Sequence, residues 1–314
     1  MSVVAVFPGQ GSQAVGMGRS LADASSAARV VFQEVDEALG EKLSALIFEG
    51  PIETLTLTAN AQPALMATSL AAVRALEERL GAAVDTKVSY VAGHSLGEYS
   101  ALAAAGAVGI GDAARLLRLR GQAMQDAVPP GEGAMAAILG LDPDKADEVA
   151  REAGAHGICE LANDNADGQA VLSGSKDAVE RAMTIAKEKG AKRVLLLQVS
   201  APFHCALMAP AAARLAEALA ITTFSAPSVP LIANVTAEPV TDPALLADLL
   251  VRQATSRVRW RESMATMARL GTQTVLELGA GKVLTGLAKR GVPGAAMLNL
   301  AEPADLDTVA AALA

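Results

Sequence analysis

The chain has 314 residues, of which 52% are hydrophobic and 19% charged, a balance typical of a compact globular protein and unlike that of a disordered one. Its formal net charge of -8 gives no overall attraction for nucleic acid or an anionic membrane, although an anionic substrate needs only a local positive site. Its two cysteines, Cys159 and Cys205, are too few for a disulfide framework, so we expect a cytoplasmic protein.

Short apolar runs alternate with helix-like segments along most of the chain, which predicts an α/β protein with a mainly parallel sheet. The first run lacks a basic leader and reads as a strand rather than a signal peptide, and no run approaches the roughly 20 residues of a membrane span. The expected strands are Val3–Phe7, Val88–Ala92, Val229–Val235, Thr274–Leu278 and Ala295–Leu298. Helices are expected over about Ala61–Leu80 and from Leu96, Asp112, Leu207, Pro243, Glu262, Lys282 and Asp305.

The middle of the chain has a different pattern. In order it predicts a strand Ala134–Gly140, a helix Asp144–Ala153, strands Ile158–Ala162 and Gln169–Ser173, a helix Lys176–Lys189 and a strand Arg193–Val199. That βαββαβ order is ferredoxin-like. We therefore expect residues 129–200 to form a small subdomain inserted into a larger α/β subdomain of residues 1–128 and 201–314.

The sharpest local motif is Gly93-His94-Ser95-Leu96-Gly97, between an expected strand and an alanine-rich helix. This is the nucleophile-elbow pattern, in which small residues flank a serine on a tight turn near a helix N-terminus. Backbone N–H groups of such a turn can stabilise an oxyanion. An ordinary glycine-bounded turn is the alternative, but the flanking elements favour Ser95 as a nucleophile.

A serine nucleophile needs a base, and the chain has three histidines. His94 adjoins Ser95, and its side chain is expected to diverge and to pack or hydrogen-bond beside the site. His156 is expected in a solvated loop. His204 lies where the chain returns to the larger subdomain, and a cleft is favoured at such a junction, so it is the best candidate. No aspartate stands out as its partner, which leaves a backbone or amide carbonyl.

Arg120 lies in the apolar stripe of the helix that begins at Asp112, whereas Arg115 and Arg118 fall on its far, solvent-facing side. A buried guanidinium needs an anionic or multiply accepting partner. An internal ion pair is one reading. The other is a two-pronged clamp on a substrate carboxylate, which would select a dicarboxylic acyl group.

Other polar residues have less specific readings. The glycine-flanked loop after Phe7 places the Gln10 backbone N–H as a possible second oxyanion donor, with a tight turn as the alternative. Gln62 and Gln253 have no local explanation beyond surface polarity. Asn163 and Asn165 are expected in a turn between two strands. The cysteines and histidines do not form a metal-binding spacing.

Several motifs together resemble the malonyl-CoA:acyl carrier protein transacylase family from end to end. They include Phe7 to Gln13, Gln62-Pro63-Ala64, Gly93 to Tyr99, Arg120 to Met124, Asn163 to Gln169, Pro202-Phe203-His204 and Gln253 through Trp260. The resemblance implies an α/β-hydrolase-like domain with a ferredoxin-like insert. The reaction that it implies needs no cofactor or metal. It implies malonyl-CoA and holo acyl carrier protein as partners, and nothing in the sequence suggests an obligate oligomer.

The resemblance also implies residue roles. Ser95 would carry the acyl group, His204 would be its base, and Gln10 and Leu96 would donate the oxyanion hole. Gln253 would orient His204 through its carbonyl. The substrate pocket would be formed by Arg120, Gln62, His94, Met124, Asn165, Phe203 and Gln253. Phe203 would leave little room for an α-methyl branch, which favours malonyl over methylmalonyl.

Three alternatives stay open at this stage. A serine thioesterase or hydrolase would share the elbow but would not explain an inward Arg120. A polyketide-pathway or malonate-decarboxylase-type malonyltransferase would use the same residues. A carrier-binding protein without activity would not need both Ser95 and His204. The carrier is usually acidic, so a local basic patch would be needed, with Lys192, Arg193, Lys282, Lys289 and Arg290 as candidates.

Overall fold

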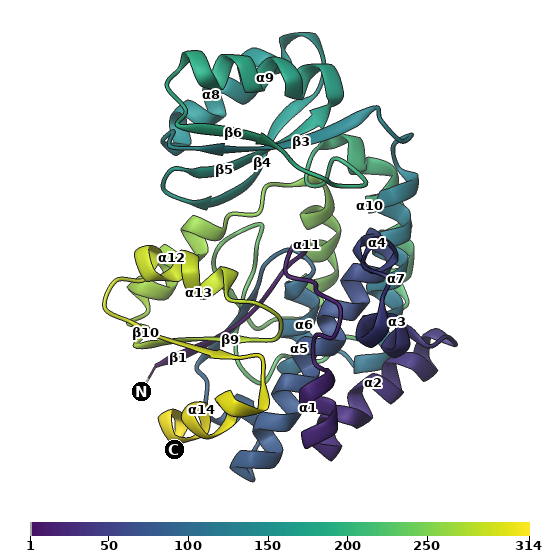
Figure 1. Cartoon of the computed structure of the whole chain (residues 1–314). Helices are drawn as coiled ribbons and strands as arrows, with labels where there is room; N and C mark the ends of the chain where they lie inside the picture. Colours follow the sequence, from purple (N-terminus) through teal and green to yellow (C-terminus); the bar gives the residue numbers. More distant parts are fainter. Residues whose placement is uncertain (1) are drawn as a thin grey trace.

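The computed structural model describes residues 2–314 and contains two sheets (Figure 1). The larger sheet has the strand order β10-β9-β1-β2-β7-β8. Its strands are β1 (Val3–Phe7), β2 (Tyr90–Gly93), β7 (Leu231–Ile232), β8 (Pro239–Val240), β9 (Thr274–Leu278) and β10 (Ala296–Leu300). All pairs are parallel except β7 with β8. The expected mainly parallel sheet is therefore present.

Helices enclose this sheet. They are α1 (Arg19–Ala24), α2 (Ser26–Leu39), α3 (Leu43–Glu49), α4 (Ile52–Thr56), α5 (Thr58–Leu80), α6 (Gly97–Ala104), α7 (Ile110–Asp126), α10 (Ala209–Ala220), α11 (Pro243–Thr255), α12 (Trp260–Arg269), α13 (Val283–Gly291) and α14 (Leu306–Leu313). Helix α5 is buried along most of its length because α2, α6, α7 and α14 pack around it. Its many alanines allow this close packing, as the aliphatic composition suggests. No helix within residues 2–314 has both the length and the apolar character of a membrane span.

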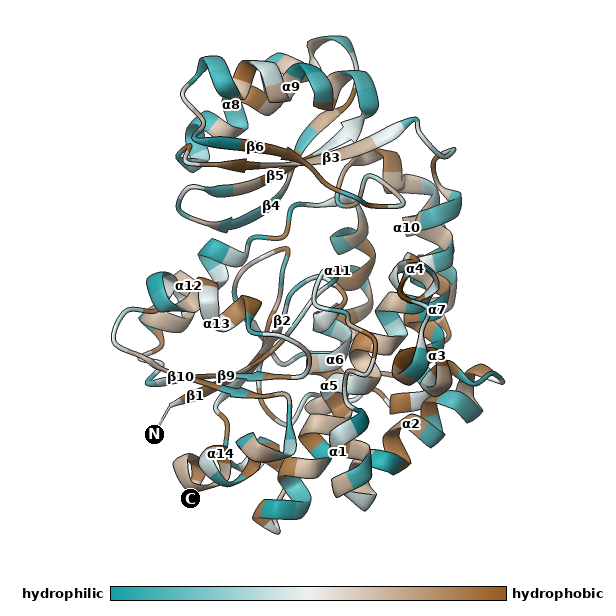
Figure 2. Cartoon of the chain, viewed as in Figure 1, coloured by the Kyte–Doolittle hydropathy of each residue, from teal (hydrophilic) through white to brown (hydrophobic). Residues whose placement is uncertain are grey.

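The smaller sheet lies above the larger one in Figure 1, with α8 (Pro143–Ala153) and α9 (Lys176–Glu188) on its outer face. Its strands are β3 (Gly133–Leu139), β4 (Cys159–Ala166), β5 (Gln169–Ser175) and β6 (Arg193–Leu196), in the antiparallel order β4-β5-β3-β6. Both helices are amphipathic (Figure 2), and their apolar stripes form a separate core with the sheet around Val149, Leu172 and Val179. The βαββαβ element order is the one expected for this segment.

Strand β4 links the two layers. Val258, from the segment between α11 and α12, exchanges backbone hydrogen bonds with Ala162 and Asp164 at 2.8 and 3.0 Å. Arg261 of α12 donates to both carboxylate oxygens of Asp164, which is buried. These contacts hold the smaller sheet against the carboxyl edge of the larger one, where a parallel sheet binds ligands.

The structure corrects several expectations. Asn163 and Asn165 lie within β4 and not in a turn, because that strand continues to Ala166 and the turn falls at Asp167-Gly168. The expected strand Val229–Val235 is reduced to β7, since Pro230 has no N–H to donate and the chain turns back at Asn234 toward β8. Helices α1 to α4 were not predicted. Helices α1, α3 and α4 are too short to show a clear period, but α2 spans 14 residues with an apolar stripe at Ala28, Val31, Phe32 and Val35, so its omission is an error of interpretation.

Candidate active site

Ser95 lies on a tight turn between β2 and α6, with a left-handed backbone φ of 53°. The flanking glycines are required by close backbone approach. A Cβ on Gly93 would lie 1.9 Å from the Gly97 backbone, and a Cβ on Gly97 would lie 2.2 Å from the carbonyl oxygen of Phe7. A non-glycine residue held in this conformation is strained, and such strain is typical of functional turns. The elbow geometry expected from the sequence is therefore present.

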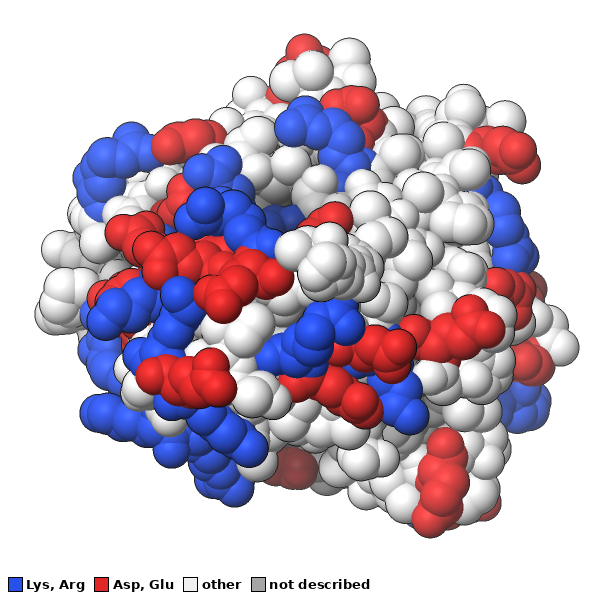
Figure 3. Space-filling view, turned by 90° about the horizontal axis from the view of Figure 1, so that it is seen from above, with Lys and Arg blue, Asp and Glu red and all other residues white. Residues whose placement is uncertain are grey.

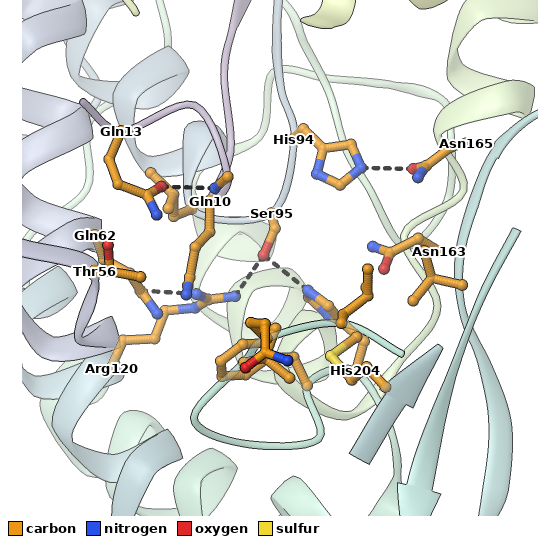
Figure 4. A pocket seen from close by; sticks show the side chains of 18 residues that line it. Gln10, Gln13, Thr56, Gln62, His94, Ser95, Arg120, Asn163, Asn165 and His204 are labelled. Atoms are coloured by element: carbon orange, nitrogen blue, oxygen red, sulfur yellow. Dashed lines mark hydrogen bonds between the residues drawn. The ribbon is translucent and has the colours of Figure 1, made fainter. Parts of the chain in front are cut away.

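The Ser95 hydroxyl faces His204 across 2.8 Å, measured from Oγ to Nε2 (Figure 4). On the other side of the ring, Nδ1 lies 2.9 Å from the backbone carbonyl oxygen of Gln253. A carbonyl can only accept, so Nδ1 carries the proton and Nε2 is left to accept the serine proton. Within residues 2–314 no carboxylate is hydrogen-bonded to the imidazole of His204, and the backbone carbonyl of Gln253 has the orienting position.

Two causes keep His204 neutral. The side chain is 4% exposed, and this burial lowers its pKa to about 3, with the nearby Arg120 cation adding to the effect. A histidine acts as a general base in its neutral form, and His204 is in that form beside the serine hydroxyl.

His204 also has a left-handed backbone φ of 59°, so both members of the pair have strained backbones.

Arg120 projects from α7 into the same site and is 1% exposed. Its Nη1 donates to Gln62 Oε1 at 2.8 Å, and its Nη2 donates to Gln253 Oε1 at 2.8 Å and to Ser95 Oγ at 3.1 Å. No carboxylate within residues 2–314 forms an ion pair with it within 4.0 Å, so the reading as an internal ion pair is wrong. Because a guanidinium only donates, Ser95 Oγ accepts from Arg120 and directs its own proton toward His204.

Two residues that line the same cavity as the serine have free backbone N–H groups. Gln10 follows β1 and Leu96 follows Ser95, and neither donates its N–H to an acceptor in the described part of the chain. The N–H of Ser95 itself is engaged, since it donates to Asn234 Oδ1 at 2.8 Å. The side chain of Gln10 anchors this loop, since its Nε2 donates to Thr58 Oγ1 at 3.2 Å. The N–H groups of Gln10 and Leu96 are therefore free to bind a ligand oxygen.

These groups line a cavity of about 340 Å³, a size typical of small-molecule sites. Of the predicted residues, the lining includes Gln10, Gln62, His94, Ser95, Leu96, Arg120, Asn165, Phe203 and His204. Met124 and Gln253 lie one layer behind it, where Met124 accepts from Gln62 at 3.8 Å. The smaller sheet and its exit segment add lining that was not predicted, namely Met135, Asn163, Val171, Leu197, Gln198 and Val199, and the larger layer adds Gly11, Gln13 and Thr56.

His94 diverges from Ser95 and pairs with the smaller sheet, as Figure 4 shows. Its Nε2 lies 2.8 Å from Asn165 Oδ1, so Nε2 carries the proton, and burial lowers its pKa. Surface polarity, the alternative reading of Gln62 and Gln253, is wrong, since these side chains are 1% and 0% exposed. Arg118 is also less solvated than predicted, because its guanidinium donates to Ala59 O and Asn60 Oδ1 and pairs with Glu41.

Sequence reasoning missed two residues behind the elbow. Asn234 accepts from Ser95 N and donates to Gly93 O at 2.7 Å, which braces both sides of the turn. Glu98 is 1% exposed and contacts both Gln253 and Asn234. Asn234 gives no local signal, but a glutamate one helical turn after the nucleophile in an otherwise small and apolar helix could have been singled out. Within residues 2–314, no three His, Cys, Asp or Glu side chains gather as a metal site would require.

A serine on a strand-to-helix elbow, a neutral histidine and two free N–H groups are the groups that acyl transfer through a serine ester requires. The family model of the acyl transferase domain matches residues 4–305 of the chain. The chain is an acyltransferase of this family.

The similar proteins narrow the class. The chain is 49% identical to the malonyl CoA-acyl carrier protein transacylase of Bacillus subtilis over 92% of its length and 90% of the relative's. It is 47% identical to the same enzyme of Escherichia coli K12, with 95% of each chain covered. Its fold matches the acyl-carrier-protein-S-malonyltransferase of Bartonella henselae with a TM-score of 0.97 and 53% identity, over 100% and 99% of the two chains. The chain belongs to the malonyl CoA-acyl carrier protein transacylase family.

A further solved structure includes a partner. It is a complex of a type II PKS acyl-carrier protein with its malonyl-transacylase, and the chain matches the transacylase with a TM-score of 0.95 and 43% identity, over 99% and 100% of the two chains.

Proposed function

We propose that this chain transfers a malonyl group from malonyl-CoA to the phosphopantetheine thiol of holo acyl carrier protein, through a malonyl ester on Ser95. The names of the relatives support malonyl transfer from coenzyme A to an acyl carrier protein. The product would supply malonyl groups for fatty acid chain elongation. The observation that carries the malonyl specificity is Arg120, a buried guanidinium beside the serine whose partners are neutral. A malonyl carboxylate is the anion that such a group would bind through two parallel hydrogen bonds.

The first half-reaction forms the ester. Ser95 Oγ attacks the thioester carbonyl while His204 Nε2 takes the hydroxyl proton, and the oxyanion accepts from the N–H groups of Gln10 and Leu96. As the tetrahedral intermediate collapses, the C–S bond breaks and the imidazolium returns its proton to the leaving thiolate. Coenzyme A therefore leaves as the thiol, and the enzyme keeps the malonyl group.

The second half-reaction runs in the opposite sense on the carrier. His204 takes the proton of the pantetheine thiol, the sulfur attacks the ester carbonyl, and Ser95 leaves with that proton. Coenzyme A and the carrier have the same pantetheine arm, so one channel serves both steps in a ping-pong sequence. The proposed roles of the dyad need no metal and no further cofactor.

Arg120 also links substrate binding to the base. Its charge lowers the pKa of His204, as burial does to a larger extent. A malonyl carboxylate bound to the guanidinium would offset that charge and make the imidazole a better proton acceptor. An acetyl group lacks the carboxylate and would not have this effect.

The proposal divides the chain into two subdomains. Residues 129–200 form the small ferredoxin-like subdomain, and residues 1–128 and 201–314 form the larger α/β-hydrolase-like subdomain. Two further cavities continue from the active site between them. One shares Asn165 and Val171 with it and is lined by Lys282 and Arg290, and the next is lined by Lys192 and Arg290. Figure 3 shows acidic and basic side chains interspersed on the face seen from above, so an acidic carrier would depend on such local basic groups.

Cys159 and Cys205 are free thiols, which is consistent with a location in the reducing cytoplasm. We also expect the enzyme to act as a monomer.

Intact-protein mass spectrometry tests this function. Wild-type protein mixed with malonyl-CoA should gain one malonyl group, and Ser95→Ala should gain none. A wild-type protein that forms no adduct would remove the proposal, and an adduct that persists in Ser95→Ala would place the acyl group elsewhere.

A further inference from the structure

A buried carboxylate lies directly behind the nucleophile and touches none of the proposed reacting atoms. Glu98 stands in the first turn of α6 and is 1% exposed. No lysine or arginine within residues 2–314 forms an ion pair with it within 4.0 Å. The helix N-terminus offsets part of the cost of burying it, but an exposed carboxylate would gain from that position too. Its burial therefore needs another explanation.

The side chain of Gln253 is its principal partner. Gln253 Nε2 donates to the Glu98 carboxylate and, at 3.0 Å, to the backbone carbonyl of Ser95. The other end of the amide, Oε1, accepts from Arg120 at 2.8 Å. A carboxylate accepts and a guanidinium donates, so these two groups hold the amide in a single orientation. Without Glu98, only Arg120 and the Ser95 carbonyl would define it.

Glu98 also supports the second brace of the serine. Its two carboxylate oxygens each lie 3.4 Å from the backbone nitrogen of Asn234. The side chain of Asn234 accepts a hydrogen bond from the backbone N–H of Ser95. The side chain of Gln253 donates one to the backbone carbonyl of the same serine. One carboxylate therefore stands behind both residues that hold the strained backbone of the nucleophile.

We propose that Glu98 is a positioning residue for the transfer reaction, which fixes the Gln253 amide and through it the alignment of the nucleophile, the base and the guanidinium. Gln253 is suited to this relay because its backbone carbonyl holds His204 while its side chain holds Arg120 and Ser95. The Glu98 carboxyl group lies one amide away from Arg120, so it acts on the guanidinium without occupying the donors that a malonyl carboxylate would use. This inference rests on the proposed malonyl transfer.

The test begins with the kinetics of malonyl loading for Glu98→Ala and Glu98→Gln beside the wild type. Glu98→Ala should lower kcat by about 10- to 100-fold, the loss expected for a hydrogen bond to a charged group, with a smaller change in KM. Glu98→Gln keeps an acceptor oxygen toward Gln253, so it should recover most of kcat. A change confined to KM, or equal losses in both variants, would contradict a positioning role that depends on this acceptor.

A double-mutant cycle shows whether the effect passes through Gln253. Gln253→Ala removes the amide but leaves the backbone carbonyl that holds His204. Once the amide is absent, adding Glu98→Ala should change kcat by less than about threefold, because the two positions act as one unit. Losses that simply multiply would show that Glu98 acts independently, and the relay would be wrong.

A matched control separates this role from general stability. Asp36 is another buried carboxylate, 6% exposed, which accepts from Ser44 N and Oγ at 2.8 and 2.6 Å and does not line the active-site cavity. Asp36→Asn should lower the melting temperature and leave kcat unchanged. Failure of the wild type to load would reject the proposed function. A wild type that loads, with folded Glu98 variants at the same kcat, would reject the positioning role alone.

Discussion

Replacing Arg120 by alanine should convert a malonyl-selective enzyme into one that hardly distinguishes malonyl from acetyl. A two-pronged pair with the malonyl carboxylate contributes two charge-assisted hydrogen bonds, about 3–6 kcal/mol in total. The guanidinium must exchange bonds to Gln62, Gln253 and Ser95 for that pair, so the lower end applies. We expect malonyl loading to slow by about 100-fold. Acetyl loading should change by less than about tenfold, because removing the cation also removes one of the causes that lower the pKa of His204.

The assay is the rate of acyl-enzyme formation with malonyl-CoA and with acetyl-CoA, followed by intact mass in a single turnover. Arg120→Lys keeps the charge but loses the fork, so its selectivity should be intermediate. Arg115→Ala is the control, since this side chain on the same helix is 56% exposed and pairs with Asp112. Equal losses for both thioesters in Arg120→Ala would refute the clamp and make Arg120 a structural residue.

Three further predictions concern the elbow, the pocket and the pH dependence. Gly97→Ala should lower the loading rate at least about 100-fold in folded protein, because its Cβ would lie 2.2 Å from Phe7 O; a rate near wild type, measured beside circular dichroism, would contradict the tight turn. Phe203→Ala should raise methylmalonyl loading relative to malonyl about tenfold, the value of one methyl group in a pocket, as a competition between the two thioesters would measure. Burial raises the pKa of Glu98 from 4.5 to about 7, so the fold favours its protonated form. This shift contributes about 3 kcal/mol to the free energy of unfolding, a contribution that is complete below pH 4.5 and is lost as pH rises through about 7. Urea unfolding of wild type and Glu98→Gln at pH 5 and 8 should show this loss only in the wild type.

The sequence predicted the parts of the site that have a local signature. Ser95 was found because its glycines and flanking elements form a motif, and Arg120 because a cation stands in an apolar helical stripe. Both signals reflect constraints within a few residues of each group. The parallel sheet and the βαββαβ segment were predictable for the same reason, since their periodicity is local.

The rest depends on contacts between distant segments. Gln253 lies 158 residues from the serine whose carbonyl it holds, and Asn234 lies 139 residues from it. No neighbour in sequence indicates the burial of either residue, so only the family resemblance indicated a role for Gln253, and Asn234 was missed. Asn163 and Asn165 were assigned to a turn because asparagine favours turns. In the structure β4 pairs with β5 as far as Ala166, and Val258 pairs with Asn163 from the other side, so strand pairing overrides that preference.

The most direct test of the transfer is the fate of an isolated malonyl-enzyme. The ester is formed with malonyl-CoA, freed from excess thioester and mixed with holo acyl carrier protein, while the masses of both proteins are followed in time. We predict that the enzyme loses its malonyl group at the rate at which the carrier gains one, and that it keeps the ester when only apo carrier is added. Loss to water at the same rate with or without holo carrier would contradict the account and indicate a hydrolase.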